Sequence, residues 1–175
     1  MKRGFKAAIL IGLMSGMTAV AGETGTPMID VPNAVVIDEG VLGGGQPDEN
    51  LLRQAADAGY RTIVNTRLPG EEGSLENEDE LVRSLGMTYI SLPTRGGDTF
   101  NEKNARRLAE ILDDPAALPA MVHCASGNRV GILFAVKAFY VDGLDGPAAL
   151  EFGTRTGARR IPAEVQRLLA GESDD

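Results

Sequence analysis

The residues best suited to chemistry lie within 123–131, where His-Cys-Ala-Ser-Gly-Asn-Arg-Val-Gly follows a short apolar run. Cys124 is the only cysteine of the 175 residues, so no intramolecular disulfide can form. A thiolate is a strong nucleophile, whereas a thiol buried as a small hydrophobic residue is inert. Arg129 follows Cys124 after four intervening residues, and a guanidinium can hold two oxygens of a tetrahedral oxyanion. The pattern favours a Cys124 nucleophile beside an Arg129 anion clamp over a buried structural cysteine.

Backbone groups of the same loop are expected to bind the anion. Gly127 can adopt the left-handed backbone that turns successive N–H groups toward one point. A helix beginning near Asn128 would add the positive end of its dipole. Both effects favour the thiolate of Cys124 over its thiol. The predicted substrate-binding residues of the loop are Ala125, Ser126, Gly127, Asn128 and Arg129.

The elements that must position this loop alternate between strand and helix. Short β-rich segments are expected at 34–37, 41–42, 61–65, 87–92 and 120–123. Helical patterns are expected at 47–59, 75–85, 101–112, 128–141, 147–155 and 161–169. Such alternation predicts an α/β fold of three layers, α/β/α, with a mostly parallel central sheet. The strand at 61–65 then delivers Arg67 to the carboxyl edge of the sheet, where open α/β sheets place their chemistry.

The N-terminus predicts export. Lys2, Arg3 and Lys6 precede apolar residues 7–20, which end in the small residues 19–21. This is the layout of a secretory signal peptide, with an uncleaved anchor as the alternative. Because no longer apolar run follows, we expect a periplasmic or secreted chain without stable membrane insertion. The predicted divisions are a signal peptide at 1–21, a flexible segment at 22–33, one domain at 34–170 and a disordered tail at 171–175.

Composition narrows the possible partners. Hydrophobic residues make up 43% of the chain, enough for one core. The formal net charge of −8 argues against nucleic-acid binding, which needs a basic face. His123 is the only histidine, so a multi-histidine metal site is excluded. No cofactor or metal is expected, and the acidic run at 71–80 is interpreted as a solvated helix.

Three groups of residues resemble a known family. They are Gly44-Gly45-Gln46-Pro47, then Val64-Asn65-Thr66-Arg67 followed by Glu71, and His123-Cys124 with Gly127 and Arg129. The chain from about Val35 to Val141 thus resembles the cysteine-dependent protein tyrosine and dual-specificity phosphatases. The particular resemblance is to bacterial beta-lactamase hydrolase-like proteins with a phosphatase-like domain. It implies a protein tyrosine phosphatase-like fold and a phosphorylated substrate or small oxyanion as partner.

The resemblance also implies roles for single residues. His123 would order the loop, Cys124 would form a phosphocysteine, and Arg129 would bind phosphate. Asp98, in a glycine-rich loop before a helix, would protonate the leaving oxygen. A helix-start carboxylate is an equally good interpretation of Asp98, and a hydrogen-bonded core residue is an alternative for His123. Arg67 is a further candidate for substrate binding, or else a solvated or salt-bridged arginine.

Two departures from the phosphatase pattern leave the reaction open. Such phosphatases place five residues between Cys and Arg, whereas this chain has four, and Val130 replaces a hydroxyl residue. Cys-x-x-Gly-x-Arg is the loop length of rhodanese-like sulfurtransferases, in which the cysteine carries a persulfide. We therefore keep three hypotheses: a phosphatase, a sulfurtransferase, and a non-catalytic phosphate- or sulfate-binding module. Basic residues that extend the site, or else form a charged helix face, are Arg155, Arg159 and Arg160.

Overall fold

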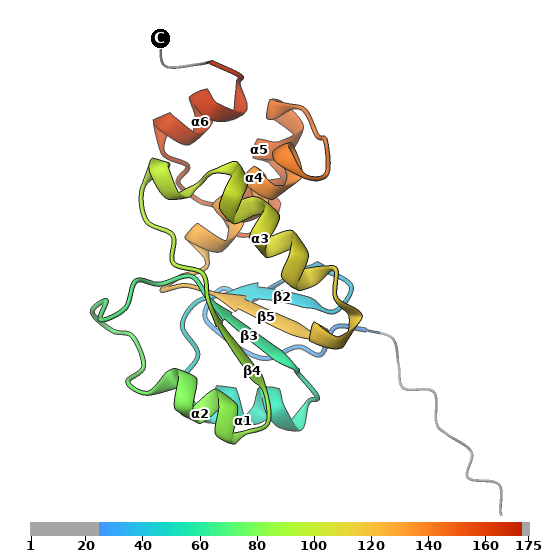
Figure 1. The fold of residues 1–175 in the computed structure, drawn as a ribbon, viewed down its shortest axis with the longest axis vertical. Coiled ribbons are helices and arrows are strands. Elements are labelled where there is room, and N and C mark those ends of the chain that lie inside the picture. Colours follow the sequence, from blue (N-terminus) through green and yellow to red (C-terminus); the bar gives the residue numbers. More distant parts are fainter. Residues whose placement is uncertain (1–24, 173–175) are drawn as a thin grey trace, which may run out of the picture.

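A computed structural model describes residues 25–172, which form one five-stranded sheet with helices on both faces (Figure 1). The predicted signal peptide at 1–21 and the last residues of the predicted tail, 173–175, lie outside the described residues. The strand order is β1-β2-β5-β3-β4. The strands are β1 (Val35–Asp38), β2 (Val41–Gly44), β3 (Thr62–Asn65), β4 (Thr88–Ser91) and β5 (Ala120–His123).

The central strand β5 carries the predicted nucleophile loop. It pairs in parallel with β2 and β3, while β1 pairs antiparallel with β2 at one edge. All four residues of β5 are buried, as expected for an apolar strand covered on both faces. Gly44 of β2 and Asn65 of β3 both lie opposite His123, so three strands end at the same level. The chain segments that follow these strands therefore meet at one edge.

Helices cover the sheet in two layers. Helices α1 and α2 lie on one face, and α3 to α6 lie on the other (Figure 1). The helices are α1 (Glu49–Asp57), α2 (Glu78–Ser84), α3 (Glu102–Leu112), α4 (Asn128–Tyr140), α5 (Gly146–Arg155) and α6 (Ala163–Leu169), with short 3-10 turns η1 (Gly97–Thr99) and η2 (Pro115–Ala117). The predicted three-layer α/β/α arrangement with a mostly parallel sheet is confirmed.

Local capping explains where the helices begin. The Asp48 side chain accepts a hydrogen bond from Leu51 N at 2.8 Å and caps α1, so Pro47 lies before the helix and not in its first turn. Asn101 caps α3 in the same way. The helix expected at 75–85 begins only at Glu78, because the chain before it makes turns that return toward the sheet edge.

Close backbone contact joins α4 to α5. A Cβ atom on Gly131 of α4 would lie 2.1 Å from Ala158 N, and one on Gly153 of α5 would lie 2.6 Å from the Cβ of Ala135. Glycine is needed at both positions because any side chain would separate the helices. This packing fixes the segment after α5 beside the start of α4, where the predicted anion-binding loop ends.

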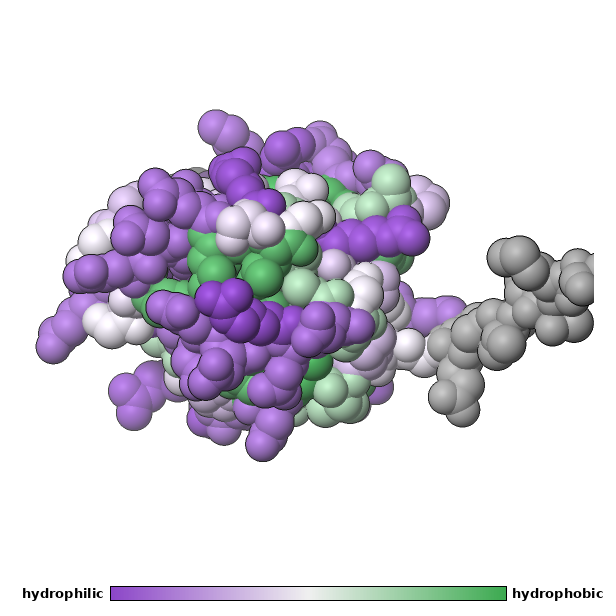
Figure 2. Space-filling view, turned by 90° about the horizontal axis from the view of Figure 1, so that it is seen from below, coloured by the Kyte–Doolittle hydropathy of each residue, from purple (hydrophilic) through white to green (hydrophobic). Residues whose placement is uncertain are grey.

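Part of the segment predicted to be flexible, 22–33, packs on the core. Ile29 and Val31 are buried, and the Tyr60 hydroxyl donates a hydrogen bond to the carbonyl of Pro27. Burial raises the pKa of Tyr60 to about 12. Within residues 25–172 no helix has the length and apolarity to cross a bilayer. The end of the molecule formed by α1 and α2 is mostly hydrophilic around a small group of hydrophobic residues (Figure 2).

Candidate active site

Cys124 lies immediately after β5 and begins the loop that leads to α4. Its side chain is buried, and its sulfur accepts a hydrogen bond from Gly127 N at 3.0 Å. This contact requires the left-handed backbone of Gly127, whose φ is +84°. An N–H donor aimed at the sulfur stabilises a thiolate more than a thiol.

The carbonyl groups of the loop are held by neighbouring segments. The Ala125 carbonyl accepts from Gln46 N at 3.3 Å, and the Ser126 carbonyl accepts from the Asn33 side chain at 3.1 Å. Among residues 25–172, the N–H groups of Ala125 and Ser126 have no hydrogen-bond acceptor. The loop therefore offers unpaired donors next to the first turn of α4, the arrangement expected of an anion nest.

The Arg129 guanidinium is fixed by one carboxylate. Nη1 and Nη2 of Arg129 donate to the two oxygens of Glu71 at 2.8 and 2.5 Å, and Nη1 also donates to the Thr94 carbonyl at 3.2 Å. A guanidinium has five N–H groups, so the edge formed by Nε and the second hydrogen of Nη2 is left for another acceptor. This edge has the fork geometry that binds two oxygens of a phosphate.

Two neighbours, the Glu71 carboxylate and the Cys124 sulfur, affect the pKa of Arg129. Burial alone would lower the pKa of Arg129, but the Glu71 carboxylate and the nearby Cys124 sulfur raise it instead. The hydrogen bond from Arg129 lowers the pKa of Glu71 to about 2, against the opposing effect of burial and with help from Leu68 N and Arg67. The raised pKa means that the Arg129 guanidinium keeps its positive charge.

Arg67 holds the Glu71 carboxylate in place. Its guanidinium donates to Glu71, to the Gln46 side chain and to the carbonyls of Glu72 and Gly73, at distances between 2.5 and 3.2 Å. Only 3% of its side chain is exposed. The structure thus places Arg67 in a salt-bridged support for Glu71, which is one of the two interpretations the sequence left open.

His123 is fully buried beside a second carboxylate. Its Nε2 lies 2.7 Å from Oε1 of Glu78, a side chain that is 3% exposed. The other oxygen of Glu78 accepts from Gln46 at 2.8 Å and from Asn65 at 3.3 Å. Because a carboxylate accepts, Nε2 is assigned as the protonated nitrogen. Glu78 thereby links the end of β5 to the end of β3 and to Gln46, which follows β2.

The prediction of a solvated helix at 71–80 was wrong for its two most important carboxylates. Glu71 binds Arg129 and Arg67, and Glu78 binds His123. Charge balance could have indicated that these carboxylates turn inward, because buried arginine and histidine side chains at one sheet edge require hydrogen-bond acceptors. The strand-to-helix segment after β3 is the nearest source of them.

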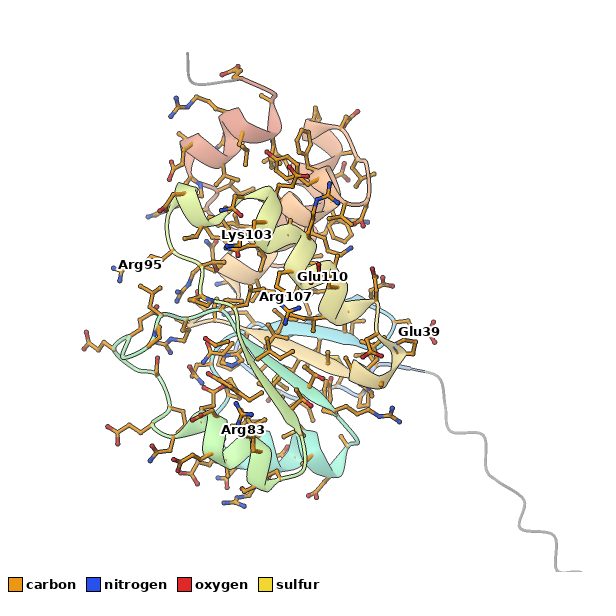
Figure 3. The ribbon with its side chains drawn as sticks, in the orientation of Figure 1. Glu39, Arg83, Arg95, Lys103, Arg107 and Glu110 are labelled. Carbon is orange, nitrogen blue, oxygen red and sulfur yellow. The ribbon has the colours of Figure 1, made fainter. Side chains whose placement is uncertain are left out.

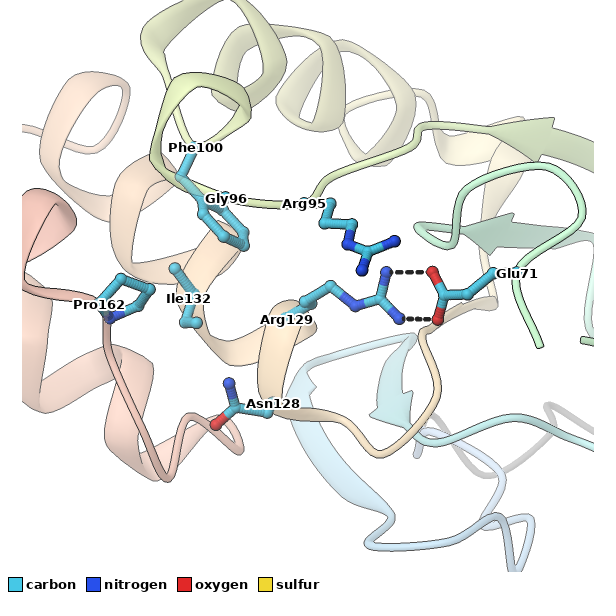
Figure 4. Close-up of a pocket in the computed structure, with 8 residues that line it drawn as sticks. All are labelled: Glu71, Arg95, Gly96, Phe100, Asn128, Arg129, Ile132 and Pro162. Atoms are coloured by element: carbon cyan, nitrogen blue, oxygen red, sulfur yellow. Dashed lines mark hydrogen bonds and ion pairs between the residues drawn. The ribbon is translucent and has the colours of Figure 1, made fainter. Parts of the chain in front are cut away.

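A pocket of about 350 Å³ opens above this loop (Figure 4). One side is cationic and the other apolar, so the pocket fits an anionic group attached to a less polar body. The residues that line it are Glu71, Arg95, Gly96, Phe100, Asn128, Arg129, Ile132 and Pro162. Asn128 also binds the segment after α5, since its Oδ1 accepts from Arg159 N and Arg160 N at 2.7 and 2.8 Å.

Asp98 is exposed and does not line this pocket. It lies in η1, where its carbonyl accepts from the Asn101 side chain at 2.7 Å. The glycine loop is packed against α6, because a Cβ on Gly97 would lie 2.1 Å from Cγ of Glu164. For Asp98 to protonate a leaving group, its side chain would have to turn toward the pocket.

Solved structures with the same architecture belong to phosphatases. A candidate phosphatase from Shewanella putrefaciens CN-32 superposes with a TM-score of 0.63 at 16% identity, covering 82% of this chain and 92% of that one. The core catalytic domain of the PP-IP phosphatase SIW14 from S. cerevisiae gives a TM-score of 0.62 at 14% identity, covering 85% and 90%. At these identities the likeness establishes the fold, a protein tyrosine phosphatase-like α/β/α domain.

Sequence comparison defines the family within that class. The family described as "Beta-lactamase hydrolase-like protein, phosphatase-like domain" matches residues 37–139, and the chain belongs to it. The predicted resemblance is confirmed. The chain is 29% identical over 106 residues to a beta-lactamase hydrolase-like protein of Xylella fastidiosa (strain Temecula1), which covers 59% of this chain. This match spans 24% of the length of that relative.

Proposed function

We propose that this chain is a cysteine-dependent phosphatase that hydrolyses phosphoesters through a phosphocysteine. One observation carries the proposal: the Gly127 N–H and the charge of Arg129 both act on the Cys124 sulfur, while an edge of the Arg129 guanidinium stays available for oxyanions. A phosphoryl group seated on that edge and on the loop N–H groups would present its phosphorus to the sulfur.

In the first step the Cys124 sulfur attacks phosphorus, the S–P bond forms and the ester P–O bond breaks. Arg129 and the N–H groups of Ala125 and Ser126 stabilise the charge on the non-bridging oxygens. In the second step water attacks phosphorus and the S–P bond breaks, which releases phosphate and the thiolate. Val130 supplies no hydroxyl to assist the leaving sulfur, so we expect this second step to limit turnover.

Activity should depend on the thiol. Wild-type protein is expected to release phosphate from p-nitrophenyl phosphate, and Cys124→Ser should reduce kcat/KM by about a thousandfold or more. Arg53→Ala, at an exposed position of α1, is the matched control and should leave the rate unchanged. A Cys124→Ser rate equal to that of wild type would refute the covalent mechanism.

The role of Asp98 as general acid is tested separately. If Asp98 protonates the leaving oxygen, Asp98→Asn should slow the hydrolysis of phenyl phosphate by about a hundredfold. The hydrolysis of p-nitrophenyl phosphate should slow much less, because nitrophenolate leaves without a proton. Equal rates of wild type and Asp98→Asn on both esters, with identical pH profiles, would remove Asp98 from the mechanism.

Loop length favours a second candidate, a sulfurtransferase. The four residues between Cys124 and Arg129 give a smaller cradle than five would. In that reaction Cys124 attacks the outer sulfur of thiosulfate, the S–S bond breaks with loss of sulfite, and cyanide then takes the persulfide sulfur as thiocyanate. Thiocyanate formation by wild type, with no phosphate release from aryl phosphates, would favour this candidate. Anion binding without either product would indicate a binding module.

Export is also part of the proposal. It is supported by the basic residues and apolar run of 1–21. Fractionation of cells that express the full chain, with the mass of the N-terminal peptide, tests it. Recovery of the uncleaved chain in the cytosol would refute export.

A further inference from the structure

A second arginine lines the pocket. Arg95 lines the pocket beside Arg129, yet no carboxylate or carbonyl among residues 25–172 binds its guanidinium. Its exposed side chain projects from the loop before α3 (Figure 3), on the same side of the pocket as Arg129 and Glu71 (Figure 4). Arg95 is therefore free to bind an external anion.

The backbone at Arg95 is held in place. Arg95 N donates to the Thr99 hydroxyl at 2.7 Å, and that hydroxyl donates to the Gly96 carbonyl at 3.0 Å. Phe100, which is 2% exposed, anchors the same turn in the core. A fixed backbone reduces the entropy lost when the long side chain binds a ligand.

Several exposed arginines of this protein are paired with carboxylates, whereas Arg95 is paired with none of the described ones. The chain has a formal net charge of −8, so carboxylates are in excess. Exposed arginines on α1 and α3 are paired with glutamates of the same helix, as in Arg53–Glu49, Arg106–Glu102 and Arg107–Glu110. Glu71, the one carboxylate lining the pocket among the described residues, is already bound to Arg129. Two guanidiniums in one pocket repel each other until an anion lies between them.

The opposite wall limits what the ligand can be. Phe100, Ile132 and Pro162 make it apolar, and the pocket volume of about 350 Å³ suits a compact molecule. A ligand that satisfies both sides has two anionic groups next to one another on the cationic side and a small, less polar body on the other.

We infer that Arg95 forms a second anion subsite, so that the preferred substrate carries another phosphate close to the one that is hydrolysed. The inference rests on the proposed function for the identity of the reacting phosphate, which Arg129 and the loop hold. Arg95 binds the neighbouring phosphate and acts as a specificity-determining residue. The substrate class is thus a compact bisphosphate or diphosphate.

Binding of two non-hydrolysable probes tests the subsite. Calorimetry should show that wild type binds methylenebisphosphonate about tenfold more tightly than methylphosphonate, the gain expected from one more charge-assisted contact. Arg95→Ala should bring the ratio of the two affinities close to one, and Arg95→Lys should restore part of it. Arg53→Ala is the matched control for a lost surface arginine and should keep the wild-type ratio.

The outcomes separate this inference from the proposed function. Equal affinity of wild type for both probes, or a preference that survives in Arg95→Ala, would overturn the subsite even if aryl phosphate is hydrolysed. A preference that disappears in Arg95→Ala would support the subsite even if wild type released no phosphate, which would refute the proposed function alone.

Discussion

At the scale of single residues, Glu71 connects the two arginines Arg129 and Arg67. It binds both Nη atoms of Arg129 and the Nε of Arg67, so it sets where the Arg129 fork points. The carboxylate does not compete for the Nε edge of Arg129, which is the edge we assign to substrate. In the proposed reaction Glu71 is accordingly a positioning residue, which would act on phosphate through Arg129.

The free energy of unfolding at acid pH should report the ion pair between Glu71 and Arg129. The pKa of Glu71 is about 2 in the folded chain against an ordinary value of 4.5. A lowered pKa means that the carboxylate contributes stability above pH 4.5, and that this contribution is lost as the pH falls toward 2. Urea unfolding at several pH values should show that, as the pH falls from 4.5 toward 2, Glu71→Gln loses less free energy of unfolding than wild type does.

A surface ion pair provides the control for this measurement. Glu102→Gln removes a carboxylate paired with Arg106 in which both side chains are about half exposed, and such pairs contribute little. Its pH dependence should follow that of wild type. Parallel curves for wild type and Glu71→Gln would contradict the assigned pairing.

At the scale of elements, the α4–α5 contact positions one wall of the pocket. Gly131 allows the two helices to touch, and the segment that follows α5 then reaches Asn128 through the backbone N–H groups of Arg159 and Arg160. The apolar residue Pro162 belongs to the same segment. A substitution that separates α4 from α5 should therefore move this wall away from the loop between Cys124 and Arg129.

Gly131→Ala should destabilise the fold. The new Cβ would lie 2.1 Å from Ala158 N and 2.7 Å from the Gly153 carbonyl, and both are backbone atoms that cannot rotate aside. Overpacking of this kind costs about 1–3 kcal/mol, more than the ~1 kcal/mol that alanine gains over glycine within a helix. Chemical denaturation measures the loss. Gly25→Ala, where a Cβ meets nothing within 4 Å, is the control, and equal stability of the two variants would contradict the packing.

At the scale of the whole molecule, one buried phenol ties the segment before β1 to the sheet. Tyr60 follows α1 and donates to the Pro27 carbonyl, while Ile29 and Val31 fill the core beside it. The N-terminal segment therefore contributes to the stability of the domain as well as leading into it.

Alkaline unfolding tests this attachment. The pKa of Tyr60 is raised by burial from 10.0 to about 12. The neutral phenol is favoured in the folded state, so its stabilising contribution is complete below pH 10 and is lost as the pH rises toward 12. Tyr60→Phe should lower stability at neutral pH by about 1 kcal/mol and flatten the alkaline decline. An equally steep decline in Tyr60→Phe would show that another group is responsible.

The sequence by itself determined the fold class and the position of the loop that carries Cys124, between a strand and a helix. Strand β5 and helix α4 were predicted within one residue, because a short apolar run and a long helical pattern are local signals. The left-handed turn at Gly127 also followed from local chemistry, since glycine accepts a positive φ without steric cost.

Only the tertiary structure decided which charges meet. Glu71 reaches Arg129 across 58 residues of sequence, and Glu78 reaches His123 across 45. An acidic run has the same composition whether it is solvated or turned inward, so no local pattern distinguishes the two. The structure shows that Arg67, a candidate substrate ligand, is buried and bound to Glu71, and that Arg95 lines the pocket. Neither could be decided from the sequence, because burial and partners are properties of the packed chain.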